Sequence, residues 1–66
     1  MDMVYLEEKI NESGLKRQYI ADKIGISRWG LRDKLMKPGR WKVSEMTALI
    51  SLLNLSESDS KRIFNL

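Results

Sequence analysis

The side chains best suited to chemistry in this sequence are the cations of its middle segment. Residues 16–42 carry nine Lys and Arg against two Asp, a net charge of +7, whereas residues 1–15 carry −3 and residues 43–66 carry −1. A basic segment between acidic flanks favours one face that binds a polyanion. A solvated, lysine-rich surface would give the same counts, so charge alone does not decide between the two.

Missing residue types exclude most enzymatic and metal chemistry. The 66 residues contain neither cysteine nor histidine, which removes disulfides, thiolate metal sites, cysteine nucleophiles and the commonest general base. The nine acidic residues form no apparent apolar pocket pair, and the four isolated glycines form no phosphate-binding loop. We therefore expect a chain that is not an enzyme and that holds no metal and no cofactor.

Length and hydropathy limit the architecture. A chain of 66 residues and 7.7 kDa is expected to form one domain, residues 1–66. No apolar run approaches the roughly 18–20 residues needed to cross a bilayer, and the acidic N-terminus does not resemble a signal peptide. These features predict a soluble, cytoplasmic binding domain with no membrane partner.

Hydrophobic spacing predicts helices in the first part of the chain. Apolar residues at i, i+3 and i+7 favour a helix over 3–13, with Asp2 as its N-cap and Gly14 at its end. A second segment, over 15–25, keeps its apolar residues on one face. Ser27 is a suitable N-cap for a third helix, which should stop near Met36 because the residue before a proline avoids helical backbone.

Two further helices are predicted after the turn formed by Pro38, Gly39 and Arg40. Ser44 is expected to cap the fourth, and Ser56 with Asp59 resembles a capping box that opens a fifth ending at Phe64. The fourth helix has a broad apolar stripe made of Val43, Met46, Leu49, Ile50 and Leu53. No segment alternates with period two. The predicted fold class is therefore all-α, a compact bundle of about five short helices.

The second and third helices meet in a pattern typical of a helix-turn-helix. Ala21 is small where the two helices would cross, and Gly25 can adopt the positive φ that a sharp turn requires. The residues expected to fill the wedge between the helices are Ile20, Ile24, Ile26 and Leu31.

With these residues, the sequence resembles the Cro/CI-type (lambda-repressor-like, xenobiotic-response-element) helix-turn-helix family. The resemblance rests on Ile20-Ala21, on Ile24-Gly25-Ile26-Ser27-Arg28 and on Leu31, and it extends over about residues 3–64. It implies a small phage or prophage Cro-like regulator of a bacterial or phage-infected bacterial cell. It also implies double-stranded operator DNA as the partner and a homodimer at least on DNA.

A helical wheel places part of the third helix toward solvent. With Leu31 and Leu35 inward, Trp29 and Asp33 point most directly outward, and Arg28 can reach past the helix end. If this helix enters the major groove, the residues expected to read base edges are Arg28, Trp29, Arg32 and Asp33. Asp33 is more expected to orient a neighbouring arginine than to contact a base. Trp29 has an alternative place, leaning on the loop or on Trp41.

Other polar residues fit contacts to phosphates, which set the register without reading sequence. These are Arg17, Gln18, Ser27, Lys37, Arg40 and Lys42, whereas Lys23 and Lys61 fit solvated charges. The apolar stripes are expected to form the core, through Leu6, Ile10, Ile20, Ile24, Leu31, Leu35, Met46, Ile50 and Leu53. Trp41 is expected to pack under the loop, and Ile63 and Phe64 to close the core, with a dimer contact as the alternative.

The sequence thus favours a sequence-specific DNA-binding transcriptional regulator, a Cro-like repressor acting by operator occupancy. The main alternative is a protein-binding antirepressor or adaptor module that keeps the same fold. Trp29 and Asp33 on the exposed face motivate that alternative. A non-specific nucleic-acid binder is the third hypothesis, and it would lack a preference over competitor DNA.

Overall fold

Residues 1–37 and 39–65, which the computed structural model describes, form five α-helices and no strand. The helices are α1 (Met3–Ser13), α2 (Arg17–Ile24), α3 (Arg28–Met36), α4 (Val43–Leu52) and α5 (Glu57–Phe64). The all-α fold class and the number of helices are therefore confirmed. The part of the predicted turn that falls on Pro38 lies outside the described residues.

Side-chain caps begin three of the helices at the predicted places. The Asp2 carboxylate accepts the Tyr5 backbone N–H at 3.0 Å, and the Ser27 hydroxyl accepts the Gly30 N–H at 3.0 Å. At α5, Ser56 and Asp59 form the predicted reciprocal capping box, with bonds of 3.0 and 3.1 Å. Each bond satisfies a backbone donor that has no partner within its helix.

The predicted N-cap of α4 is wrong by two residues. Lys42, not Ser44, is the N-cap, and the Glu45 carboxylate accepts the Lys42 backbone N–H at 3.0 Å. Val43 does not belong to the buried stripe, since 72% of it is exposed. The buried face of α4 is centred on Leu49, and Val43 lies about 120° away from it on the helical wheel.

Two left-handed glycines end α1 and α2. Gly14 has φ of 72° and Gly25 has φ of 82°. Residues with a Cβ rarely adopt this conformation, whereas glycine does so at little cost. Each of these helices therefore ends at its glycine, where the chain turns toward the next helix.

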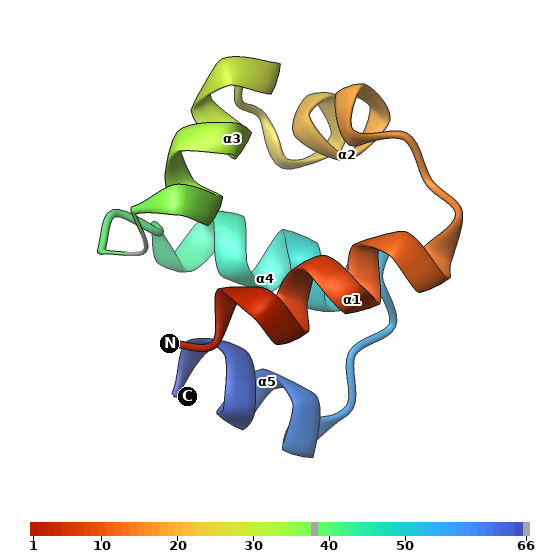
Figure 1. Cartoon of the computed structure of the whole chain (residues 1–66), viewed down its shortest axis with the longest axis vertical. Coiled ribbons are helices and arrows are strands. Elements are labelled where there is room, and N and C mark those ends of the chain that lie inside the picture. Colours follow the sequence, from red (N-terminus) through yellow and green to blue (C-terminus); the bar gives the residue numbers. More distant parts are fainter. Residues whose placement is uncertain (38, 66) are drawn as a thin grey trace.

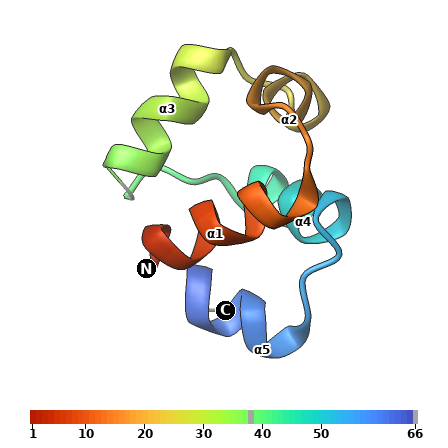
Figure 2. The same cartoon turned by 45° about the vertical axis from the view of Figure 1, so that its right-hand side comes forward.

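The helices are arranged with α2 and α3 at one end of the molecule and α5 at the other (Figure 1). α1 and α4 lie between them, and the turned view of Figure 2 shows the same order. α2 packs against both α3 and α4, and α1 packs against α5 and α3. The Asp2 backbone N–H donates to the Ile63 carbonyl at 3.1 Å, so the start of α1 is tied to the end of α5.

The core lies where these five helices meet. Six of the nine predicted core residues are buried, namely Leu6, Ile10, Ile20, Ile24, Leu31 and Met46. Leu35, Ile50 and Leu53 are half-buried and pack against that core. Ile63 and Phe64 are buried as predicted, and Trp41 packs edge-on against Phe64 with ring centroids 5.6 Å apart. Among the described residues, no helix is long and apolar enough to cross a bilayer.

A polar network joins α1 to α5. The Tyr5 hydroxyl donates to Asp59 at 2.6 Å, and the Arg62 guanidinium lies over the Tyr5 ring, 3.9 Å from its centroid. Arg62 also pairs with Asp2 at 3.2 Å. The Tyr5 hydrogen bond lowers the pKa of Asp59, and the Tyr5 backbone N–H, together with Arg62, lowers that of Asp2. Both carboxylates are therefore stabilised in their charged form.

Candidate functional site

The chain passes from α2 into α3 through three residues, 25–27. The Ile26 backbone N–H donates to the Ala21 carbonyl at 3.0 Å, which closes the end of α2. Ala21 is fully buried, so α2 can approach its neighbours closely. Ser27 then caps α3, and this fixes where the helix starts and which of its residues face solvent.

One side of α3 packs against the core, and the other side is exposed to solvent. Leu31 is its buried residue, with 1% of its surface exposed. All four predicted base-reading residues are exposed, namely Arg28, Trp29, Arg32 and Asp33. Trp29 is 71% exposed, and the Arg32 guanidinium lies 5.6 Å from the centre of its ring. The alternative that Trp29 leans on Trp41 is wrong, because Trp41 is buried against Phe64.

Asp33 does not orient an arginine. In the described part of the chain, no cation lies within ion-pair distance of its carboxylate. Its backbone carbonyl accepts the Lys37 N–H at 2.7 Å, which helps to end α3. The Asp33 side chain is therefore exposed to solvent.

The two predicted phosphate-binding residues at the start of α2 already have partners. Arg17 pairs with Glu7 of α1 at 3.5 Å and donates to the Asn11 side chain at 3.4 Å. Gln18 donates to the Asp22 carboxylate at 2.9 Å. These contacts are at the surface, where a single ion pair contributes only about 0–1 kcal/mol. A phosphate can therefore compete for Arg17 at small cost.

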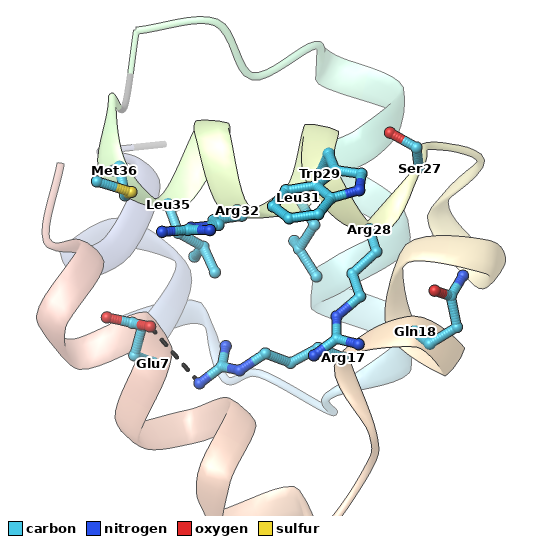
Figure 3. A pocket seen from close by; sticks show the side chains of 10 residues that line it. All are labelled: Glu7, Arg17, Gln18, Ser27, Arg28, Trp29, Leu31, Arg32, Leu35 and Met36. Atoms are coloured by element: carbon cyan, nitrogen blue, oxygen red, sulfur yellow. Dashed lines mark ion pairs between the residues drawn. The ribbon is translucent and has the colours of Figure 1, made fainter.

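The structure brings six of the ten predicted site residues to one groove. Arg17, Gln18, Ser27, Arg28, Trp29 and Arg32 line it, together with Glu7, Leu31, Leu35 and Met36. Its volume is about 880 Å³. Figure 3 shows Arg28, Leu31 and Leu35 extending from α3 toward the groove, with the Glu7–Arg17 pair on its other side.

The other four predicted site residues do not line this groove. Lys37, Arg40 and Lys42 are exposed in the segment after α3, and Asp33 lies on the outer side of α3. The basic residues among those predicted thus lie in two areas, one at the groove and one at the α3–α4 connection.

Sequence reasoning missed a buried ion pair behind α3. The Lys34 ammonium lies 2.9 Å from Glu45 of α4 and donates to the Arg40 carbonyl at 2.8 Å. Burial raises the pKa of Glu45, but the Lys42 N–H and the Lys34 ammonium outweigh this, so the pKa lies below its ordinary value. The signal was present, since Glu45 precedes Leu49 by four residues and shares its buried face.

Gly30 is explained by its own helix cap. A Cβ at this position would lie 3.2 Å from the Ser27 hydroxyl oxygen and 3.7 Å from the Ile26 Cβ. The close contacts are therefore with the N-cap of α3 and the turn that precedes it.

Residues 1–37 and 39–65 contain no group of three acidic side chains placed to hold a metal ion. Comparison with protein-family models, with curated proteins and with solved structures finds no match for this chain. What the site does must therefore be argued from its own geometry and charge.

Proposed function

We propose that the chain is a sequence-specific, double-stranded DNA-binding transcriptional regulator. In this proposal α3 enters the major groove and the chain acts by occupying an operator. The observation that carries it is the outer face of α3, where Arg28, Trp29, Arg32 and Asp33 are all exposed on a helix held from behind by Leu31. A major groove is about 12 Å wide and admits one helix with its side chains.

Each exposed residue of α3 has a chemically suitable partner on a base edge. Arg28 and Arg32 can each donate two hydrogen bonds to O6 and N7 of guanine. The Trp29 ring can pack on a thymine methyl group, and the Asp33 carboxylate can accept from a cytosine amino group. Because Arg32 already lies near the Trp29 ring, these two residues act together.

The remaining predicted residues fit phosphate contacts on either side of α3. Arg17, Gln18 and Ser27 lie at one end, and Lys37, Arg40 and Lys42 lie at the other. Arg17 would exchange its exposed pair with Glu7 for a phosphate. The resemblance to Cro/CI-type regulators supports the same assignment, including a dimer on DNA and a bacterial or phage-infected bacterial cytoplasm as its location.

The test is selection of the full chain on randomised duplex DNA at about 0.15 M salt. Arg28→Ala and Arg32→Ala are selected in parallel, with Lys23→Ala as the control for loss of an exposed cation outside the groove. We expect an enriched, two-fold symmetric motif that persists with Lys23→Ala and becomes degenerate at single positions with the arginine variants. Failure to enrich any motif would refute sequence-specific binding.

A further inference from the structure

The groove between α1, α2 and α3 has an apolar side that DNA binding does not explain. Leu35 and Met36 contribute apolar side chains to it along α3, above Leu31, which is itself only 1% exposed. Met36 is 67% exposed, and Trp29 at the same groove is 71% exposed. An aliphatic surface does not contribute to phosphate binding. Neighbouring exposed apolar residues on a small chain mark a site of interaction.

The polar side of the groove is strongly cationic. Arg17, Arg28 and Arg32 line it against a single acid, Glu7, which pairs with Arg17. One terminal nitrogen of Arg17, Nη1, is buried and finds no acceptor among the described residues. A buried donor without a partner costs free energy, and an acceptor reaches this nitrogen only when the Arg17 side chain moves.

Apolar and cationic groups in one elongated groove indicate the chemistry of its occupant. Trp29 and Met36, both exposed, are two helical turns apart on one face of α3, and Arg28 and Arg32 are one turn apart. This repeat matches a helical segment that presents apolar residues on one stripe and carboxylates beside it. A small organic anion would satisfy one arginine, whereas an acidic segment satisfies several along the groove.

We propose that this groove binds an acidic, amphipathic helical segment of a partner protein. The apolar residues of the segment pack on Trp29, Leu35 and Met36, and its carboxylates bind Arg28 and Arg32. Both arginines also belong to the proposed DNA-reading face, so the segment and the DNA exclude each other. The partner would therefore release the chain from its operator by direct competition.

A second copy of the chain is a poorer occupant. Its most acidic helix is α1, and Val4 is the large apolar side chain that α1 exposes. One such residue does not make the apolar stripe that the groove would pair with. Seating α1 of one copy in the groove of the next is a head-to-tail contact, which leaves a free groove at the end of each assembly and does not close in a dimer.

The test selects peptides without any DNA. A display library of random peptides about 16 residues long, enough for four helical turns, is selected on the immobilised full chain. We expect enrichment of acidic peptides with apolar residues three and four positions apart. An enriched peptide should lose at least about tenfold in affinity with Met36→Ser and with Arg32→Glu. Duplex DNA should displace it.

Matched controls make the result specific. Val43→Ser is the control for Met36→Ser, because it removes an apolar side chain of similar exposure. Lys23→Glu is the control for Arg32→Glu, because it makes the same charge reversal. Neither Val43 nor Lys23 lines the groove. Both should bind the peptide as the parent does. The proposal is overturned if no acidic, apolar peptide is enriched, or if Met36→Ser and Arg32→Glu bind as well as the controls. It is also overturned if sedimentation of the parent shows an oligomer that Arg32→Glu dissociates, because a second copy of the chain would then occupy the groove. None of these results depends on DNA binding, so either proposal can fail alone.

Discussion

The ammonium of Lys34 and the carboxylate of Glu45 form a 2.9 Å ion pair with both side chains largely removed from solvent. Glu45 also accepts the Lys42 backbone N–H at 3.0 Å, and Lys34 donates to the Arg40 carbonyl at 2.8 Å. One pair thus joins α3, the connection after it and the first turn of α4. The pair holds α3 against α4, on the side of α3 away from the residues that are proposed to read DNA.

Removing the cation of this pair should destabilise the fold. Lys34→Met leaves Glu45 buried without a counter-charge, which typically costs about 3–5 kcal/mol. In the parent the pKa of Glu45 lies below its ordinary 4.5, so its contribution to stability is present above 4.5 and is lost as pH falls through the folded pKa. Lys34→Met removes part of this contribution, and the stability gap between parent and variant should therefore narrow in acid. Urea unfolding at several pH values measures both effects. Adding Glu45→Gln should recover part of the loss, and unchanged stability of Lys34→Met would contradict this account.

Two glycines should respond differently to alanine. Gly25 has φ of 82°, where a Cβ costs about 1–2 kcal/mol although no other atom is close. Gly39 also has open space around it, but its φ is outside the left-handed region. Thermal unfolding should show a loss for Gly25→Ala and a change within about 0.5 kcal/mol for Gly39→Ala. Equal effects would mean that the turn before α3 does not depend on the left-handed backbone.

The fold should weaken in acid through the α1–α5 network. Asp2 and Asp59 both have a pKa below the ordinary 3.8 in the folded chain. Their contribution is therefore present above 3.8 and is lost as pH falls through the folded pKa. Tyr5 behaves in the opposite way. Its hydrogen bond to Asp59 raises its pKa above 10.0, so its contribution is present below 10.0 and is lost in stronger base.

Melting temperatures recorded across the acid range test this network. Asp59→Asn should lower the melting temperature at neutral pH and flatten the decline in acid. Glu57→Gln, an exposed change on the same helix outside these contacts, should leave the decline as it is. An acid decline that is as steep in Asp59→Asn as in the parent would place the sensitivity elsewhere.

The exposed cations after α3 should act through phosphates. Lys37→Ala, Arg40→Ala and Lys42→Ala should each reduce the slope of log affinity against log salt by about 0.9 per bound subunit, because each removes one phosphate contact from every copy of the chain on the DNA. The selected sequence should not change. Lys61→Ala on α5 is the control and should keep the full slope. A changed motif in any loop variant would mean that its side chain reads a base.

Local signals in the sequence were enough to predict most of the fold. Asp2, Ser27 and Ser56 act as caps as predicted, and Gly14 and Gly25 end their helices. These features depend on neighbours within a few residues, which a sequence displays directly. The exposure of Trp29 also followed from the helical wheel, since Leu31 fixes the orientation of α3.

Contacts between distant residues were not predictable in the same way. The ion pair of Lys34 with Glu45 could not be predicted, because nothing in α3 itself indicates a carboxylate buried on α4. Asp33 was expected to orient an arginine, but Arg32 lies beside Trp29 instead. The groove itself depends on how α1 packs across α3, and the Glu7–Arg17 pair that borders it joins two helices.

The central claim, that DNA covers the outer face of α3, can be measured with the two tryptophans. Trp29 is exposed on that face and Trp41 is buried behind it, so their indole N–H signals in a nitrogen-15 spectrum report on separate places. On titration with a duplex from the selected pool, we expect the Trp29 signal and the backbone amides of residues 28–33 to shift. The Trp41 signal should shift less than the Trp29 signal, because the Trp41 side chain is buried. Binding of the duplex with an unmoved Trp29 signal, or with shifts confined to α1 and α5, would contradict the claim.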